Sequence, residues 1–195
     1  MTPQEDLVRY YRWLRHYGYN DSHSGNASIR VEDRFWITPT GACADTLSAA
    51  DLVECTLDRP CPPGASLDGT LHQRVYRRND RCRAVLHSHG AYTVAVTLAG
   101  EVFRPVDFEG WYYFNEVPVL CIPFQDYLAL APDRVALALE DHPVVVVKGH
   151  GVYACAESLN LAYKWTCSLE LSAKTYAVAE LLGSSTAPPH LAAER

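Results

Sequence analysis

Apolar residues along the chain recur with two different periods, one typical of helices and one of strands. Residues 3–18 repeat apolar or aromatic side chains with a period near 3.6, which predicts an amphipathic helix. Residues 159–182 form the longest helical stretch. Shorter helical patterns cover residues 47–51, 71–78, 92–99 and 132–139, with Pro132 expected at the first turn of the last one.

Between these helical segments lie short apolar runs that predict strands. Residues 24–28 are expected to form a polar turn, followed by a hairpin of residues 29–31 and 34–37. Further strands are predicted at 52–57, 84–87 and 117–122 and at the four valines Val144–Val147, a run typical of a strand covered on both faces. This alternation predicts an α/β fold, a single-domain α/β/α sandwich around a mixed, mostly antiparallel sheet. We expect the domain to span residues 1–183 and residues 184–195 to be a flexible tail.

Composition narrows the class of protein. The chain has 195 residues, of which 48% are hydrophobic and 21% charged, as in an ordinary globular domain. Its net charge of −6 argues against a nucleic-acid partner that is bound through phosphate neutralisation. No apolar run is long enough to predict a membrane-spanning helix. The seven cysteines are odd in number and form no CxxC pair, so we expect reduced thiols and a cytoplasmic location.

Three of the eight histidines follow buried strands. His87 and His89 are two residues apart at the end of one strand, so their side chains should point to the same face. His150 follows the valine run. Three imidazoles with open positions beside them suit a catalytic zinc site, and also Mn²⁺, Co²⁺ or Fe²⁺. The spacing alone is equally compatible with three unrelated structural histidines.

Five short blocks, in this order and spacing, resemble the class II aldolase/adducin family. They are Ser-Gly-Asn-Ala-Ser at 24–28, Ile-Thr-Pro-Thr-Gly at 37–41, Leu-His-x-x-Val-Tyr at 71–76, Ala-Val-Leu-His-Ser-His at 84–89 and Gly-His-Gly at 149–151. The resemblance runs from about residue 7 to residue 182. Five blocks in order are specific for the family and less specific for the reaction.

The resemblance implies a metal-dependent lyase that forms a homo-tetramer and acts on a small sugar or sugar phosphate. The implied reaction is reversible aldol cleavage of a ketose or ketose phosphate through an enediolate that the metal stabilises. The implied metal ligands are His87, His89 and His150, and Zn²⁺ is the first choice of ion. The implied substrate- and phosphate-binding residues are Asn26, Thr40, Gly41 and Ser66.

The chain departs from the family pattern at three places. Asp68 stands where a catalytic Glu is usual, and we expect it to be the acid/base, because it has the same chemistry with a shorter reach. Leu67 replaces a second serine of the phosphate loop, which weakens the case for a phosphorylated substrate. The catalytic tyrosine, which relatives take from a neighbouring subunit, cannot be aligned with certainty to Tyr112 or Tyr113. The aromatic residues 111–114 suggest an interface.

The sequence is also compatible with other functions. The same chemistry serves decarboxylases and dehydratases of sugar-acid or pentulose phosphates in this family. Epimerases fit less well, because they usually carry Lys-Pro-Ser-Gly where this chain has Thr-Pro-Thr-Gly at 38–41. A non-catalytic, adducin-like interaction domain is the alternative from another class, and it would have no need for three metal ligands.

Overall fold

The computed structural model describes residues 1–184 and 186–187, and within them the strands form one mixed sheet. The strand order is β3-β2-β1-β4-β8-β7-β6-β5. Every neighbouring pair is antiparallel except β6 and β7, which are parallel. The predicted mixed, mostly antiparallel sheet is therefore confirmed. The strands are β1 Asn26–Val31, β2 Arg34–Ile37, β3 Val53–Thr56, β4 Ala84–Ser88, β5 Val102–Phe103, β6 Val117–Leu120, β7 Val144–Val147 and β8 Gly151–Ala156.

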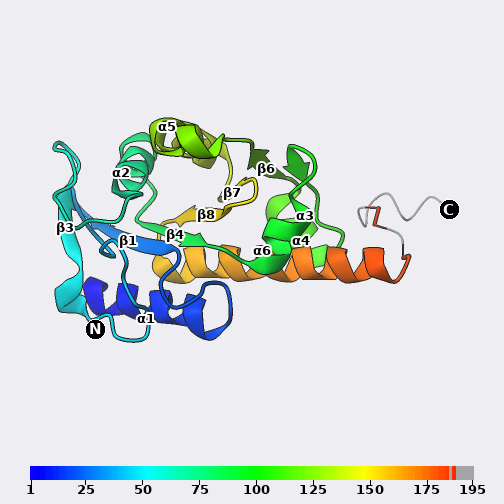
Figure 1. Cartoon of the computed structure of the whole chain (residues 1–195), viewed down its shortest axis with the longest axis horizontal. Helices are drawn as coiled ribbons and strands as arrows, with labels where there is room; N and C mark the ends of the chain where they lie inside the picture. The colour runs from blue at the N-terminus through cyan, green and yellow to red at the C-terminus, as the bar shows by residue number, and fades with distance from the viewer. Residues whose placement is uncertain (185, 188–195) are drawn as a thin grey trace.

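Helices cover both faces of this sheet (Figure 1). The α1 helix (Pro3–His16) and the long α6 helix (Leu159–Leu181) lie on one face. The α2 helix (Gly69–Arg78) and the α5 helix (Tyr127–Asp141) lie side by side on the other. The remaining helices are α3 (Ala91–Val96), α4 (Phe108–Phe114) and the 3₁₀ turns η1 (Ala49–Asp51) and η2 (Phe124–Asp126).

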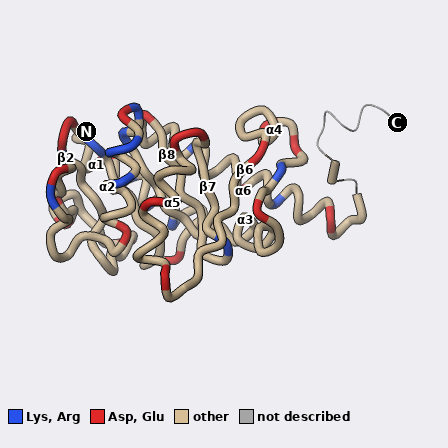
Figure 2. Tube along the Cα trace, turned by 90° about the horizontal axis from the view of Figure 1, so that it is seen from above, with Lys and Arg blue, Asp and Glu red and all other residues tan. Residues whose placement is uncertain are grey.

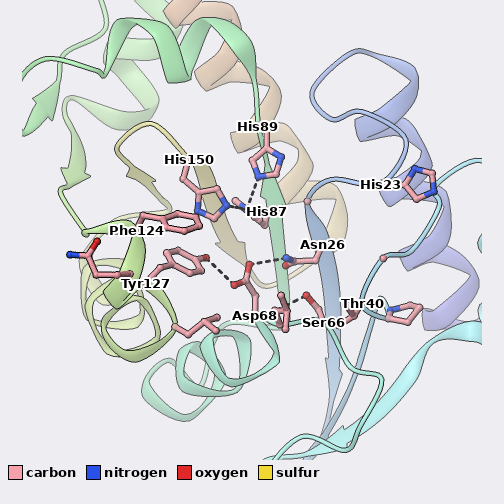
Figure 3. A pocket seen from close by; sticks show the side chains of 16 residues that line it. His23, Asn26, Thr40, Ser66, Asp68, His87, His89, Phe124, Tyr127 and His150 are labelled. Carbon is pink, nitrogen blue, oxygen red and sulfur yellow. Dashed lines mark hydrogen bonds between the residues drawn. The ribbon is translucent and has the colours of Figure 1, made fainter.

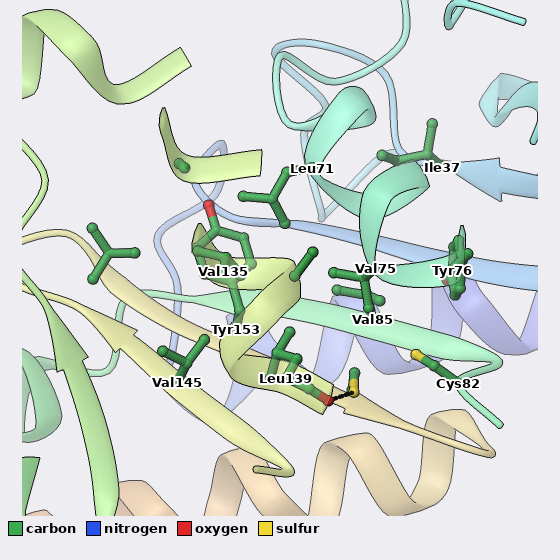
Figure 4. Close-up of a cluster of buried hydrophobic side chains, with 14 of the residues drawn as sticks. Ile37, Leu71, Val75, Tyr76, Cys82, Val85, Val135, Leu139, Val145 and Tyr153 are labelled. Atoms are coloured by element: carbon green, nitrogen blue, oxygen red, sulfur yellow. Dashed lines mark hydrogen bonds between the residues drawn. The ribbon is translucent and has the colours of Figure 1, made fainter. Parts of the chain in front are cut away.

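The face under α2 and α5 carries a core of apolar side chains (Figure 4). Leu71 and Val75 of α2 and Leu139 of α5 are buried there, as is Val145 of β7. Tyr153 of β8 is fully buried within this core, and its hydroxyl points out of the apolar cluster toward the functional pocket.

The register of three central strands places three polar side chains in one row. Asn26 of β1 pairs with His87 of β4, and His87 pairs with Tyr153 of β8. Residues paired directly across antiparallel strands point to the same face. The row therefore lies on the face that α2 and α5 cover, near the first residues of both helices.

A glycine allows β1 and β4 to meet at this row. Gly25 has a φ of +69°, and a Cβ atom there would lie 2.5 Å from the carbonyl oxygen of His87 and closer still to Nδ2 of Asn20. Only a residue without a side chain fits this approach. Asn20 in turn accepts from the N–H of His89 at 2.9 Å, so this corner also fixes the segment that follows β4.

Most sequence-predicted elements are present, with four differences. Residues 24–28 are not a polar turn, because β1 begins at Asn26 and its polar side chains have buried partners. The α5 helix begins five residues before Pro132, which lies inside it. Residues 47–51 form only the 3₁₀ turn η1. Four elements had no counterpart among the sequence predictions: β5, β8, α4 and η2.

Charged residues of both signs are interspersed along the trace (Figure 2). No helix among the described residues is long and apolar enough to cross a membrane. Of the predicted tail, residues 185 and 188–195 lie outside the described part of the chain.

The fit of Gly25 generates the first prediction. Gly25→Ala should lower the free energy of unfolding by roughly 3 kcal/mol, because the new methyl group adds a steric clash to the cost of a left-handed backbone. Urea unfolding measures this change. The matched control is Gly18→Ala, since Gly18 also has a positive φ but no neighbouring atom within 4 Å of the position that a Cβ would take; it should cost only about 1–2 kcal/mol. Equal losses in the two variants would contradict the close approach of β1 and β4.

Candidate metal centre and substrate pocket

One pocket brings together all eight site residues predicted from the sequence. Its volume is about 510 Å³, and it opens beside the row of paired residues described above. Figure 3 shows Asp68 at its centre, the three histidines on one side and Thr40 and Ser66 on the other. The predicted residues that line it are Asn26, Thr40, Gly41, Ser66, Asp68, His87, His89 and His150.

The three histidines converge through their ring nitrogens. Nε2 of His87 lies 3.0 Å from Nε2 of His89 and 3.3 Å from Nε2 of His150. One ligand atom from each residue lies within 4.8 Å of those of the other two. A tetrahedral Zn²⁺ with Zn–N bonds of 2.0–2.1 Å would hold its nitrogens about 3.3 Å apart. The spacing therefore fits a single ion of this size.

The surroundings of His87 prepare it to bind a metal. Its Nδ1–H donates to the backbone carbonyl of Val152 at 2.9 Å, which leaves the lone pair on Nε2 to face the other two histidines. Burial lowers the pKa of His87 well below its usual range and lowers that of His89 to about 4. Burial also lowers the pKa of His150. Neutral imidazole is the form that binds metal, so this donor set is ready near neutral pH.

Asp68 lies directly before α2 but does not cap it. Its carboxylate makes no hydrogen bond to the first turn of the helix, and it is turned into the pocket instead. Oδ1 accepts from the hydroxyl of Tyr127 at 2.9 Å. Oδ2 accepts from the hydroxyl of Tyr153 at 2.7 Å and from Nδ2 of Asn26 at 2.8 Å.

This environment keeps Asp68 ionised although its exposed fraction is only 7%. Burial alone would raise the pKa of the Asp68 carboxyl group. The nearby His87 and the hydrogen bonds from Tyr153 and Asn26 outweigh burial and lower the pKa to about 2. Near neutral pH the pocket thus holds one buried carboxylate beside three neutral imidazoles.

In the described part of the chain, the end of the pocket away from the histidines offers hydrogen-bond donors but no positively charged side chain. No Lys or Arg is among the described residues that line the pocket. The hydroxyl of Thr40 donates to the carbonyl of Ala65 at 2.7 Å, so that bond must break before Thr40 can bind an anion. Ser66 accepts from the N–H of Asp68 at 3.3 Å through its hydroxyl oxygen, which leaves the hydroxyl proton available. The N–H of Gly41 is a second candidate donor at this end.

His72 lies beneath the pocket and does not line it. Its Nδ1 is 2.6 Å from the hydroxyl oxygen of Ser28, which also bonds to Tyr76. Burial lowers the pKa of His72 to about 4, and the nearby Asp68 opposes this only in part. His72 is therefore a neutral, buried histidine that supports the floor of the pocket.

The structure also places in or beside the pocket residues that the sequence did not single out. Tyr127, the first residue of α5, and Phe124, the first residue of η2, line it, and Phe124 is 97% exposed. Tyr153 does not line the pocket, but its hydroxyl donates to the Asp68 carboxylate. No sequence signal marks Tyr127 or Tyr153, because each becomes recognisable only once the position of α5 and the pairing of β8 are known.

The aromatic segment after residue 110 lies away from this pocket. Tyr113 and Phe114 of α4 pack against Trp165 of α6, with ring centroids 5.5 Å and 6.0 Å from it. Phe114 is buried, whereas Tyr112 is 76% exposed. Neither Tyr112 nor Tyr113 lines the pocket of its own chain.

Comparison with known proteins links this geometry to one family. The model of the class II aldolase and adducin N-terminal domain matches residues 5–177. The crystal structure of L-fuculose-1-phosphate aldolase from Thermus thermophilus is 33% identical, with a TM-score of 0.87 over 93% of this chain and 96% of that one.

Two curated proteins with different activities are also similar. L-fuculose phosphate aldolase of Methanocaldococcus jannaschii is 25% identical over 174 residues, which are 88% of this chain and 93% of that protein. The 3-oxo-tetronate 4-phosphate decarboxylase of Cupriavidus necator is 35% identical over 106 residues, which are 53% of this chain and 48% of that protein. The similarity therefore extends to both aldolases and decarboxylases.

The three-histidine geometry generates the second prediction. Purified protein should bind close to one divalent ion per chain, and His87→Ala, His89→Ala and His150→Ala should each lose it, because a site with three protein ligands needs all of them. Elemental analysis after dialysis against Zn²⁺ measures the content. His23→Ala is the matched control, since His23 lines the same pocket outside the three-histidine group. Full metal content in the His87 variant would contradict the site.

Proposed function

Because the chain belongs to the class II aldolase and adducin family, we propose that it is a metal-dependent lyase that cleaves a small ketose phosphate by a reversible aldol reaction. The observation that carries this proposal is the juxtaposition of three converging histidines and one buried carboxylate in a single pocket. An adducin-like interaction domain would have no use for this arrangement. The similarity to L-fuculose phosphate aldolases over most of both chains supports the aldol reaction.

His87, His89 and His150 would hold the ion, and Zn²⁺ suits three neutral imidazoles. Mn²⁺, Co²⁺ and Fe²⁺ are the alternatives. When bound, the ion supplies Lewis-acid stabilisation for the negative charge that develops on the substrate as the carbon–carbon bond breaks. Asp68 takes up and returns the proton at the reacting carbon, for which its ionised carboxylate is ready. The hydroxyl of Tyr127, at the pocket wall, donates to the Asp68 carboxylate at 2.9 Å.

The phosphate group is assigned to the end of the pocket formed by Asn26, Thr40, Gly41 and Ser66. Backbone N–H groups and hydroxyls bind an anion without a formal positive charge. The acidic balance of the protein as a whole does not oppose this, because such a site acts through short hydrogen bonds.

Decarboxylation of a 3-oxo sugar-acid phosphate is the second candidate reaction. It is favoured by the 35% identity to the Cupriavidus necator decarboxylase, which covers about half of each chain. Both reactions break the bond between the α carbon of a ketone and the carbon beyond it, and both leave an enolate-type negative charge. The same pocket residues therefore serve either reaction, and the products distinguish them.

We also propose that the enzyme is a homo-tetramer located in the cytoplasm. Phe108 and Tyr112 of α4 support the assembly, because both side chains are largely exposed although they are large and apolar.

The third prediction is an assay of both reactions with Zn²⁺- or Mn²⁺-loaded protein. The proposal expects condensation of dihydroxyacetone phosphate with small aldehydes, and weaker or no reaction with unphosphorylated dihydroxyacetone. Release of CO₂ from a 3-oxo-tetronate 4-phosphate without any aldol product would instead establish the second candidate. If fully metal-loaded protein shows neither activity, the lyase proposal is contradicted.

The fourth prediction concerns Asp68. Asp68→Asn keeps the shape of the side chain but cannot take up a proton, so kcat should fall on the order of 10²–10⁴-fold while the metal content stays unchanged. Steady-state kinetics and elemental analysis measure the two quantities. Asp68→Glu retains a carboxylate and changes only the length of the side chain. Its kcat should therefore fall less than that of Asp68→Asn. Unchanged turnover in Asp68→Asn would remove Asp68 from the mechanism.

A further inference from the structure

We propose that Tyr127 and Tyr153 are positioning residues that hold the Asp68 carboxylate away from the three-histidine centre. A bound ion then keeps three protein ligands, and its other positions stay open for water and substrate. The inference rests on the proposed metal-binding role of the pocket.

The carboxylate of Asp68 is engaged on both oxygens. Tyr127 donates to Oδ1 at 2.9 Å, and Tyr153 and Asn26 donate to Oδ2 at 2.7 Å and 2.8 Å. The two tyrosine hydroxyls also contact each other. To become a ligand of the ion, the carboxylate would have to give up at least part of this charge-assisted set.

The groups that hold Asp68 are themselves fixed by packing. Tyr153 lies inside β8, opposite His87, and its ring stacks on the His87 ring at a centroid distance of 4.0 Å and an interplanar angle of 1°. Tyr127 begins α5, and its ring meets that of His150 edge-on at 4.8 Å. The two rings thus contact two of the proposed metal ligands while their hydroxyls retain the carboxylate.

The cluster of candidate ligand atoms contains no carboxylate. Among the described residues, the group with mutually close ligand atoms consists of His87, His89 and His150 alone. Aspartate also has the shorter of the two acidic side chains. The hydrogen bonds to Asp68 and its short side chain therefore both keep the carboxylate away from the three histidines.

The number of protein ligands matters for chemistry. Zinc sites closed by four protein ligands are structural, whereas catalytic sites keep an open position. With Asp68 held back, the substrate would not have to displace a protein ligand before it reaches the ion, and Asp68 would remain free of the ion to handle a proton.

The alternative is that Tyr127 and Tyr153 merely satisfy their own buried hydroxyls. Both readings predict some loss of stability when the hydroxyls are removed. Only the proposed role predicts a change in the coordination of the metal, so the test must observe the metal directly.

Co²⁺-substituted protein provides this readout, because the visible absorption of Co²⁺ weakens as its coordination number rises. Wild type and Asp68→Asn should have the same intense spectrum of a low-coordinate ion, since Asp68 is not a ligand. The double variant Tyr127→Phe/Tyr153→Phe should show a several-fold weaker band, because the released carboxylate joins the ion. Adding Asp68→Asn to the double variant should restore the wild-type intensity.

Tyr76→Phe is the matched control. Its buried hydroxyl bonds to Ser28 and makes no contact with Asp68, so its Co²⁺ spectrum should equal that of wild type. If the double variant does not fold by circular dichroism, Tyr127→Phe alone carries the test and should weaken the band in part.

Two results would overturn the inference. One is a changed spectrum in Asp68→Asn alone, which would mean that the carboxylate already binds the ion in wild type. The other is an unchanged spectrum in a folded tyrosine variant. Neither result depends on turnover, so the inference can fail while the proposed lyase activity stands, and an inactive protein with the expected spectra would contradict the activity alone.

Discussion

The register of β1, β4 and β8 is the constraint on which the pocket depends. It places Asn26, His87 and Tyr153 side by side on one face of the sheet. A slip of one residue in either pairing would turn one of these side chains to the opposite face, under α1 and α6. The close approach of Gly25 to the His87 carbonyl opposes such a slip. So does the complete burial of β4 and β8, because a slip would exchange the side chains that face the two layers of helices.

The N-terminal ends of two helices, α2 and α5, lie next to this row. Asp68 precedes the first residue of α2 and Tyr127 is the first residue of α5, and both side chains lie beside this row. The result is an asymmetric environment: burial holds the histidines neutral, while hydrogen bonds hold one carboxylate ionised among them. A buried charge without partners destabilises the folded protein. The site therefore needs the hydrogen-bond donors around Asp68 to keep that carboxylate ionised.

Much of this could be predicted from the sequence because the relevant signals are local. The period of α1 and the valine run of β7 predicted their elements directly, and the position of His87 and His89 at a strand end predicted their shared direction. The family resemblance named eight residues that the fold brings into one pocket. Each feature that the sequence did not predict was missed for a physical reason.

The missed features depend on tertiary structure. Small residues such as Ala154 and Ala156 in β8 carry no clear period, so the strand is recognised only by its pairing with β4 and β7. The helix α5 tolerates Pro132 within its first turns, where the missing N–H costs a single hydrogen bond, so the proline misled the prediction of its start. Tyr127 and Tyr153 are far apart in sequence and meet only around Asp68.

The most direct test of the account is a crystal structure of the zinc-loaded protein with anomalous diffraction at the zinc edge. We expect one peak per chain, at about 2.0–2.1 Å from Nε2 of His87, His89 and His150. We also expect the Asp68 carboxylate to remain bonded to Tyr127 and Tyr153. A peak elsewhere, or no peak at these histidines, would contradict the central claim that the paired strands build a metal centre.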